Sequence, residues 1–411
     1  MEKELKVIFT SDTHLGLKTD DIDRTEEIIS ILLDTVKQAT KYKEQEYDVI
    51  LVFGGDMFDN NNPSEKLISE FFKVLNEIKR HDIKTYYVVG NHESIADPDR
   101  LSCLSFLKEA KVGYPSITLV DDIKTAHIGQ YDIGNVYFTF LPHITKAVLE
   151  KNHRNGKALD YDSVKGYIDF KANQISKKLG QGVTHYVFSH LNVIGAHAGS
   201  EENLLKKSEV YLPQIFTNPP VGYNKPVIVQ AHIHTNQIIG NINIIGSPLY
   251  CGFGEKGRKY SADISISKSI GKKDTLNLIE TNYRPFMQLE VSFIEETRDF
   301  FEVPEVQEFY IDLMNAKEKN PIVKFDITIN PENNTYAWEE IRQKIMRLLK
   351  GVYVKPILPR VLSKKHVRSA QQKIGLTVKE SVQVYIKKNL KKEPEKAKRI
   401  YNISKKYFME A

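Results

Sequence analysis

The chain has 411 residues, of which 41% are hydrophobic and 27% charged, and its formal net charge is +5 at pH 7. This balance is that of a folded protein and excludes wholesale disorder, while the length favours two or three domains. The two cysteines exclude a disulfide framework, and no apolar run approaches the roughly 18 residues of a membrane span.

The start of the chain, MEKELKVIFTSDTH, lacks the basic segment and the long apolar stretch of a secretory signal. Few cysteines favour a reducing compartment. We therefore expect a cytoplasmic protein without a membrane association.

Short β-rich runs alternate with helical periods up to about residue 265. Helices are expected near 23–40, 64–80, 99–110 and 160–179. The predicted strands are KVIFTSD (6–12), DVILVFGGD (48–56), KTYYVVGNH (84–92), NVYFTFLPH (135–143), VTHYVFSH (183–190), KPVIVQAHIH (225–234) and NINIIGSP (241–248). This alternation predicts an α/β fold built in layers.

The pattern changes near residue 285. A strand at 286–294, a helix at 303–318, a strand at 321–329, a helix at 335–350 and a strand at 351–357 together predict a small β-α-β-α-β unit. We therefore divide the chain into domains at 1–283 and 284–358, followed by a helical segment at 359–411.

The helical segment at 359–411 carries an apolar stripe that needs a cover. Residues 341–411 hold 20 Lys and Arg against 4 Glu, a charge of +16, so the remaining chain carries 5 − 16 = −11. This asymmetry predicts a segment that binds a partner protein or faces nucleic acid. A solvated helical surface packed on its own chain is the alternative.

Five short motifs sit at the ends of predicted strands, where the loops of a layered α/β sheet share one edge. An isolated Asp there is often a helix cap, and a lone His is often structural. All five together predict a shared site. The motifs are SDTH (Asp12, His14), GGDMFD (Asp56, Asp59), GNHE (Asn91, His92, Glu93), FSH (His190) and AHIH (His232, His234).

Imidazole, carboxylate and amide donors suit divalent first-row metals. There are more donors than one tetrahedral ion can use, and two ions roughly 3.5–4 Å apart, bridged by Asp56, would accommodate them. Such a centre would carry a charge of about +2 and attract a phosphate ester. On an extended chain His232 and His234 point the same way, and each would hold one ion.

His92 follows Asn91 directly. It is placed to meet the leaving oxygen as a general acid or to steady the transition state. The alternative role for His92 is to brace its loop.

The chain resembles the SbcD/Mre-type DNA nucleases of the calcineurin-like metallophosphoesterase superfamily. GGDMFDNNNPSE, HLNVIGAHAGSEE and AHIHTNQIIGNINIIGSPLYCGFGEKG resemble motifs of the SbcD branch. The tail from KESVQVYIKKNL to KKYFMEA is similar in layout to the recombination nuclease subunit of large tailed bacteriophages. The resemblance implies a layered metallophosphoesterase β-sandwich flanked by helices, with a small α+β capping domain and a C-terminal helical segment.

Carried over by position, the resemblance assigns two sets of metal ligands and places His92 as the catalytic acid. The first ion would take Asp12, His14, Asp56 and His234, and the second would take Asp56, Asn91, His190 and His232. Two points depart from the pattern: Ala231 stands where relatives usually have Gly, and Glu93 where Asp is commoner. Asp59 stands where archaeal and eukaryotic relatives have His, so it is given only a supporting role.

The same resemblance implies two Mn²⁺ ions, although other divalent first-row metals would fit the donors. It implies DNA exonuclease and endonuclease activity, a homodimer formed by helices near the active site, and a complex with an SMC-like ATPase of the SbcC type. The unit at 284–358 would face DNA, and 359–411 would bind the ATPase. The pathway would be double-strand-break processing, recombination or replication.

Two rival functions remain open. A metallophosphatase or small-molecule phosphodiesterase could use the same dinuclear site, although the cationic tail and the extra domain argue against it. A DNA-binding or scaffold subunit without chemistry would need a lost ligand, and none is missing from the sequence.

Overall fold

The computed structural model describes residues 4–109, 113–154, 163–197, 210–293 and 303–329, with short pieces between 339 and 361. The helices expected at 359–411 fall outside these residues apart from 360–361, and so does most of the helix expected at 335–350. Among the described residues, no helix has the length and apolar character needed to cross a bilayer. The chain forms two compact units, one of residues 1–287 and 316–322 and one of residues 288–315 and 323–411.

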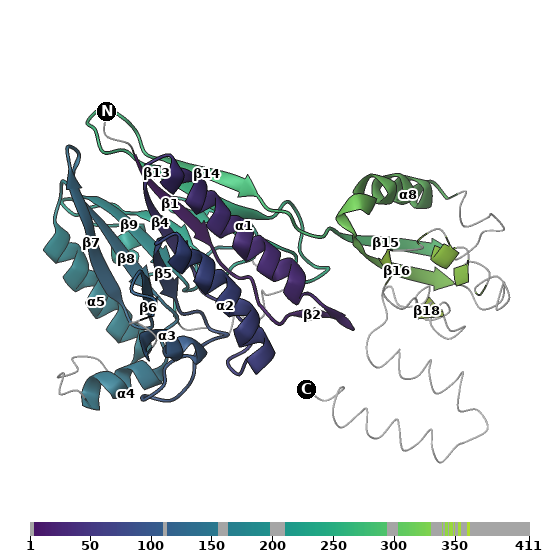
Figure 1. Cartoon of the computed structure of the whole chain (residues 1–411), viewed down its shortest axis with the longest axis horizontal. Helices are drawn as coiled ribbons and strands as arrows, with labels where there is room; N and C mark the ends of the chain where they lie inside the picture. The colour runs from purple at the N-terminus through teal and green to yellow at the C-terminus, as the bar shows by residue number, and fades with distance from the viewer. Residues whose placement is uncertain are drawn as a thin grey trace, which may run out of the picture. The chain divides into compact units, whose positions relative to one another are not determined.

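The first unit contains two six-stranded sheets (Figure 1). The first sheet has the order β14-β13-β1-β4-β5-β6, in which β1, β4, β5 and β6 run parallel and β13 is antiparallel to both of its neighbours, β1 and β14. Its strands are β1 (Leu5–Thr10), β4 (Asp48–Phe53), β5 (Lys84–Val88), β6 (Ile117–Val120), β13 (Tyr260–Ile266) and β14 (Thr275–Glu280).

The second sheet has the order β11-β12-β10-β9-β8-β7. Its four central strands are parallel, and both edge strands are antiparallel to their neighbours. Its strands are β7 (Lys124–Tyr131), β8 (Gly134–Leu141), β9 (Thr184–Ser189), β10 (Val227–Gln230), β11 (Gln237–Ile239) and β12 (Ile242–Ile244). A separate short hairpin joins β2 (Lys18–Thr19) to β3 (Ile22–Asp23).

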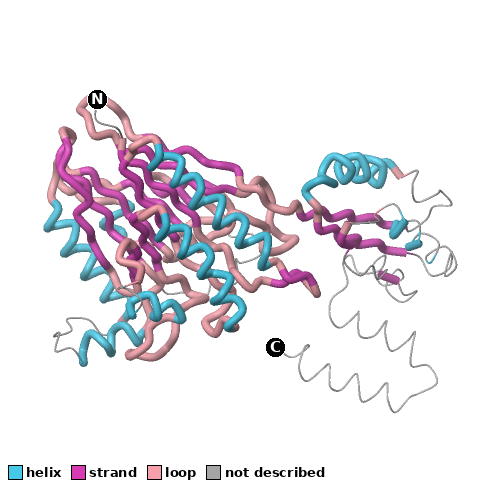
Figure 2. The backbone as a smooth tube through the Cα atoms, viewed as in Figure 1, coloured by secondary structure: helices cyan, strands magenta, loops and turns pink. Residues whose placement is uncertain are grey.

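The two sheets pack face to face, and helices cover both outer faces. Along β1, Val7 and Phe9 point into the core between the sheets, whereas Ile8 joins the core beneath the helices. The rings of Phe9 and Phe188 stack across the interface with centroids 5.9 Å apart. The first sheet is covered by α1 (Thr25–Glu44), α2 (Glu65–Arg80) and α3 (Phe106–Glu109), and the second by α4 (Lys146–Arg154), α5 (Val164–Leu179) and α7 (Gln214–Thr217). The predicted layered α/β sandwich is confirmed (Figure 2).

Local sequence signals explain where the longer helices begin and end. The Ser64 hydroxyl accepts a hydrogen bond from the amide of Leu67 at the start of α2, and Ser163 does the same for Gly166 at the start of α5. Such caps satisfy backbone donors that a helix leaves unpaired. The predicted helices at 64–80 and 160–179 therefore agree with α2 and α5 to within a few residues.

The helix expected at 99–110 is wrong over most of its length. Asp97 caps a turn by accepting from the amide of Asp99, and Pro98 lies within that turn. Ser102 then caps a 3-10 turn at Cys103–Ser105, and α3 covers only Phe106–Glu109. Residues 110–112 lie outside the described part of the chain. Proline and the side-chain caps favour turns over a continuous helix here.

The second unit contains all but the end residues of β15 (Phe286–Phe293), α8 (Pro304–Ala316) and β16 (Ile322–Ile329), with the two-residue strands β17 (Tyr353–Val354) and β18 (Arg360–Val361). Its sheet has the order β15-β16-β17, and β18 also pairs with β16. Helix α8 contacts this sheet through Phe309, whose ring centroid lies 5.5 Å from that of Phe325, and its Leu313 is buried. The strand, helix and strand expected here are present, while the role of this unit toward DNA stays a prediction.

One buried histidine on β9 predicts a pH-dependent stability. His185 is 5% exposed, and its Nε2 lies 2.9 Å from the Thr139 hydroxyl. Burial lowers its pKa from 6.5 to about 4. The unfolded chain therefore binds a proton near pH 6.5 that the folded chain refuses, so stability is lost as the pH falls from 6.5 toward 4.

As the pH falls, the wild type should lose up to about 3 kcal/mol more of its free energy of unfolding than His185→Gln, which lacks this buried imidazole. The measurement is urea unfolding of the metal-free protein at several pH values between 7 and 4.5. The same change at the exposed His153 is the control. Equal acid-induced losses in His185→Gln and the wild type would contradict the assignment.

Candidate metal centre

The side chains of the five motifs meet at one edge of the two sheets. Each follows the carboxyl end of a strand that has parallel neighbours: β1, β4 and β5 in the first sheet, and β9 and β10 in the second. Parallel strands end at the same edge, so their loops converge. The residues brought together are Asp12, His14, Asp56, Asn91, His92, His190, His232 and His234.

Asp56 belongs to two separate groups of candidate ligands. The ligand atoms of Asp12, His14 and Asp56 lie within 4.8 Å of one another, and those of Asp56, His190 and His232 do so as well. His14 and His234 lie side by side, with their Nε2 atoms 3.3 Å apart. One buried carboxylate thus stands between two clusters, which is the arrangement expected of a bridging ligand.

Asn91 joins the second cluster through His190. The Nε2 atom of His190 lies 3.1 Å from the Asn91 side-chain oxygen and 3.1 Å from Asp56 Oδ2. The amide oxygen, the imidazole and the carboxylate therefore face the same point.

The backbone of these loops adopts a conformation that side chains usually avoid. Asp12, His14, Asp56 and His232 have φ angles of 53°, 50°, 51° and 72°. Each such residue costs on the order of 1–3 kcal/mol and persists only where surrounding contacts enforce it. The Asp12 amide donates to the Gly55 carbonyl at 2.8 Å, and the His14 amide donates to the Asp56 carbonyl at 3.0 Å. These bonds link the first two loops.

Two glycines are required by close approach. A Cβ at Gly90 would lie 2.1 Å from Asp56 Oδ1, and one at Gly55 would lie 2.4 Å from His190 Nδ1. Gly55 also has a φ of 109°, which favours glycine. The glycines of GGD and GNHE therefore make room for the ligand side chains.

Partners outside the centre set the tautomers of the histidines. A ring nitrogen that donates to a carbonyl or carboxylate leaves the other nitrogen with a lone pair for a metal. His190 Nδ1 donates to the Gly54 carbonyl at 2.8 Å, and His234 Nδ1 donates to Glu255 Oε1 at 2.9 Å. Their Nε2 atoms point into the two groups of candidate ligands, His190 Nε2 toward Asn91 and Asp56 and His234 Nε2 toward His14.

His232 is held the opposite way round. Its Nε2 lies 3.1 Å from the side-chain oxygen of Asn192, so it donates there and presents Nδ1 as the ligand. Its backbone amide donates to both carboxylate oxygens of Asp12 at 3.1 Å. The chain is not extended at His232 and His234 as expected, because β10 ends at Gln230 and His232 has a φ of 72°.

The electrostatics of the centre favour an ionised Asp56. Burial would raise the pKa of Asp56, but the charges of His190, His14 and His92 outweigh it and hold the pKa well below its usual value. Burial would lower the pKa of His190, but the charge of Asp56 and its hydrogen bond outweigh burial and raise that pKa to about 9. The carboxylate is therefore ready to bind a cation.

Glu93 braces the centre from behind. It is fully buried and accepts hydrogen bonds from the amides of Asp56 at 3.1 Å, Phe58 at 3.2 Å and Gly90 at 2.8 Å, with a further bond from Met57. Burial, followed by the charge of Asp56, raises the pKa of Glu93 to about 7. From the sequence, Glu93 is only a departure from a family pattern. In the structure it ties the second loop to the third.

Asp59 contacts both His14 and His92. Its Oδ1 lies 3.5 Å from His14 Nδ1, and its backbone carbonyl accepts from His92 Nδ1 at 2.7 Å. The three side chains also offer ligand atoms within 4.8 Å of one another. The supporting role of Asp59 stays a prediction.

Sequence reasoning missed Glu255 and its partner Lys259. Lys259 is 1% exposed, pairs with Glu255 and lies with its Nζ 2.9 Å from the Ser247 hydroxyl. Burial would raise the pKa of Glu255, but its bond to His234 and the charges of His234 and Lys259 lower it. A charged carboxylate therefore holds the His234 ring.

We expect Glu255→Gln to weaken Mn²⁺ binding at the position of His234 about 10- to 100-fold, because partners that orient a metal-binding imidazole have effects of this size. Titration of free Mn²⁺ by electron paramagnetic resonance measures it. The control is Glu77→Gln, whose carboxylate pairs with Arg80 in the last turn of α2. Unchanged affinity in Glu255→Gln would show that this carboxylate does not support the ligand.

The donor set fits divalent first-row metals. It offers carboxylates, imidazoles and one amide, from residues that are mostly buried and already aimed at one another. Such nitrogen and oxygen donors suit manganese, iron or zinc. They do not suit calcium, which prefers sites made of oxygen ligands alone.

The chain belongs to the calcineurin-like phosphoesterase family, whose model matches residues 5–236. The predicted enzyme class, a phosphoesterase with this layered fold, is therefore confirmed at the level of the family. Members of the family depend on metal, and the buried donor groups agree with that.

Among curated proteins, the chain is 28% identical over 140 residues to the DNA double-strand break repair protein Mre11 of Methanosarcina acetivorans, covering 32% of this chain and 22% of that protein. It is 21% identical over 192 residues to Mre11 of Sulfolobus acidocaldarius, covering 46% of this chain and 50% of that protein. The chain thus spans half or less of these archaeal relatives.

A longer match is to a subunit of the nuclease SbcCD of Staphylococcus epidermidis, at 22% identity over 360 residues, covering 83% of this chain and 90% of that protein. These relatives confirm the resemblance to the SbcD/Mre-type proteins, while the bacteriophage likeness stays a prediction. Among solved structures, the 5'-nucleotidase of Candida albicans SC5314 matches with a TM-score of 0.33 and 13% identity, covering 78% of this chain and 59% of that one.

Proposed function

We propose that this chain is a Mn²⁺-dependent DNA nuclease, with both exonuclease and endonuclease activity, that hydrolyses phosphodiester bonds at a dinuclear centre. The observation that carries the proposal is Asp56, a buried carboxylate that belongs to two ligand groups at once. A site for a single ion would not need the second group.

The two ions would be held by eight ligand contacts from seven residues. Asp12, His14, Asp56 and His234 would hold the first, and Asp56, Asn91, His190 and His232 the second. When bound, such a pair activates water and stabilises charge on the oxygens of the phosphoryl group.

His92 is assigned the proton transfer to the leaving oxygen. Its amide donates to Asp56 Oδ1 at 2.8 Å, and its Nδ1–H donates to the Asp59 carbonyl at 2.7 Å. These two bonds fix the ring beside the centre and leave Nε2 to carry the proton. Its ring meets that of His14 edge to face, with centroids 4.6 Å apart, so it lies next to a ligand.

DNA as the substrate is supported by two observations. The relatives named above are a DNA repair protein and a component of a nuclease. The +16 charge of residues 341–411 would neutralise backbone phosphates. We also assign residues 284–358, the capping domain expected from the sequence, to face DNA.

The partners and setting follow from the same resemblance. The relative from Staphylococcus epidermidis belongs by its name to a complex, SbcCD. We assign residues 359–411 to binding an SbcC-type SMC-like ATPase, and we expect a homodimer working in the cytoplasm on DNA breaks, recombination or replication. A pull-down with residues 359–411 as bait should recover that ATPase, and recovery of DNA alone would reassign the segment.

A comparison of two substrates tests the nuclease assignment. The purified chain with Mn²⁺ should degrade linear and single-stranded DNA and lose this activity with a chelator. A chromogenic phosphodiester assayed beside the DNA tests the rival function. Much higher efficiency on the small ester with DNA left intact would favour a small-molecule phosphodiesterase or a phosphatase.

A further inference from the structure

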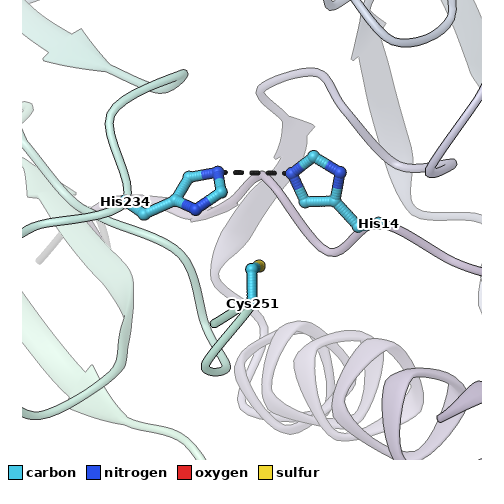
Figure 3. A group of neighbouring side chains, drawn as sticks. All are labelled: His14, His234 and Cys251. Atoms are coloured by element: carbon cyan, nitrogen blue, oxygen red, sulfur yellow. Dashed lines mark hydrogen bonds between the residues drawn. The ribbon is translucent and has the colours of Figure 1, made fainter. Parts of the chain in front are cut away.

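Cys251 lies beside the position assigned to the first ion. The ligand atoms of His14, His234 and Cys251 all fall within 4.8 Å of one another (Figure 3). The three residues come from different loops, after β1, after β10 and after β12. Cys251 is not among the ligands assigned above, so this sulfur adds a second kind of donor to the site.

The backbone fixes the cysteine relative to His234. The Cys251 amide donates to Glu255 Oε1 at 3.3 Å, and the same oxygen accepts from His234 Nδ1 at 2.9 Å. Next to it, the Tyr250 carbonyl accepts a hydrogen bond from Arg24, whose side chain is 1% exposed. One carboxylate therefore sets the position of both the loop and the imidazole.

The spacing of the two histidines suits a tetrahedral ion. Two nitrogens bound to one zinc ion at about 2.0–2.1 Å with a tetrahedral angle lie about 3.3 Å apart. The Nε2 atoms of His14 and His234 are separated by 3.3 Å. A carboxylate oxygen is also at hand, because Asp12 and Asp56 offer ligand atoms within 4.8 Å of that of His14.

Sulfur changes which metal the group prefers. Manganese favours oxygen and nitrogen ligands, whereas zinc binds thiolate and imidazole together in tetrahedral sites. A Cys-His-His set with one carboxylate or water would therefore select zinc over manganese.

We propose that Cys251, His14 and His234 form an alternative site for a thiophilic divalent ion such as Zn²⁺. Binding forms a metal–sulfur bond and releases the thiol proton to solvent. The ion takes the two histidines that the first Mn²⁺ ion would use, so zinc inhibits the nuclease. This inhibitory role rests on the proposed function, whereas the binding site itself does not.

Cobalt(II) is the probe for the site, because a cobalt–thiolate bond gives a charge-transfer absorption band in the near ultraviolet. The metal-free full-length chain should show this band on addition of cobalt. Cys251→Ser should lose it and bind Zn²⁺ about 10-fold more weakly or worse, as expected for the loss of a ligand. Cys251→Ala is a second variant, and circular dichroism checks that both are folded.

Cys103→Ala is the matched control. Cys103 is the other cysteine of the chain and is buried in the core beneath α1 and α2. This variant should keep the band and the zinc affinity. A band that persists in Cys251→Ser, or bound cobalt without a band in the wild type, would overturn the proposal.

Inhibition is measured in a separate assay of DNA cleavage with Mn²⁺. For each variant, the quantity measured is the zinc concentration that halves its cleavage rate. This concentration should rise about 10-fold or more in Cys251→Ser relative to Cys103→Ala. If the wild type shows the band but never cuts DNA, the proposed function fails and the site stands. If it cuts DNA without showing the band, the zinc site fails alone.

Discussion

Replacing His92 with alanine is expected to lower DNA cleavage at least about 100-fold, because a positioned proton donor contributes on the order of 10²–10⁴ to the rate. The His92 amide donates to the Asp56 carboxylate and its ring donates to the Asp59 carbonyl, and His92 is not assigned as a ligand. Mn²⁺ should therefore stay bound at two ions per chain. The measurements are cleavage rates at saturating Mn²⁺ and metal content after desalting.

His153→Ala is the control for this experiment, because His153 lies exposed on α4. It should cut DNA at the wild-type rate. Full activity in His92→Ala would return His92 to the alternative role of bracing its loop. Loss of metal together with activity would make it a ligand.

The second large effect is expected at Asp56. Asp56→Asn removes the charge shared by the two groups of ligands, so both ions should bind weakly and cleavage should fall at least about 1,000-fold. The Asn side chain has nearly the same shape, so the fold should be retained. Calorimetric titration with Mn²⁺ and the cleavage rate test both points.

Asp34→Asn, on the exposed face of α1, removes the same charge away from the centre and should change neither quantity. Tight binding of one ion in Asp56→Asn would mean that Asp56 serves a single ion. Tight binding of two ions with full activity would contradict the bridging assignment.

The layered fold could be predicted because its central strands are buried on both faces. Of the twelve side chains of β1 and β4, nine are apolar, which makes these strands visible in the sequence. The edge strand β7 was not predicted. Its residues 124–131 are half-buried or exposed without a clear alternation, so no period marks it.

The site could be predicted for a related reason. Strand-end motifs in parallel sheets converge whatever the length of the chain between them, so Asp12 and His190 meet although they are far apart in sequence. The direction of each ring could not be predicted. It depends on partners such as Asn192 and Glu255, whose positions are set by the path of their loops.

The roles of Glu93 and Cys251 could not be predicted either, because they too depend on the path of the loops. Glu93 faces three backbone amides of the loop after β4, and Cys251 faces His14 and His234 only because the loop after β12 returns to the centre. Neither residue lies at a spacing that reports these contacts in the sequence.

Anomalous diffraction from crystals grown with Mn²⁺ tests the central claim most directly. Two manganese peaks are expected, one bound by Asp12, His14 and His234 and the other by Asn91, His190 and His232, with Asp56 contacting both. A single peak, or two peaks that do not share Asp56, would contradict the dinuclear centre.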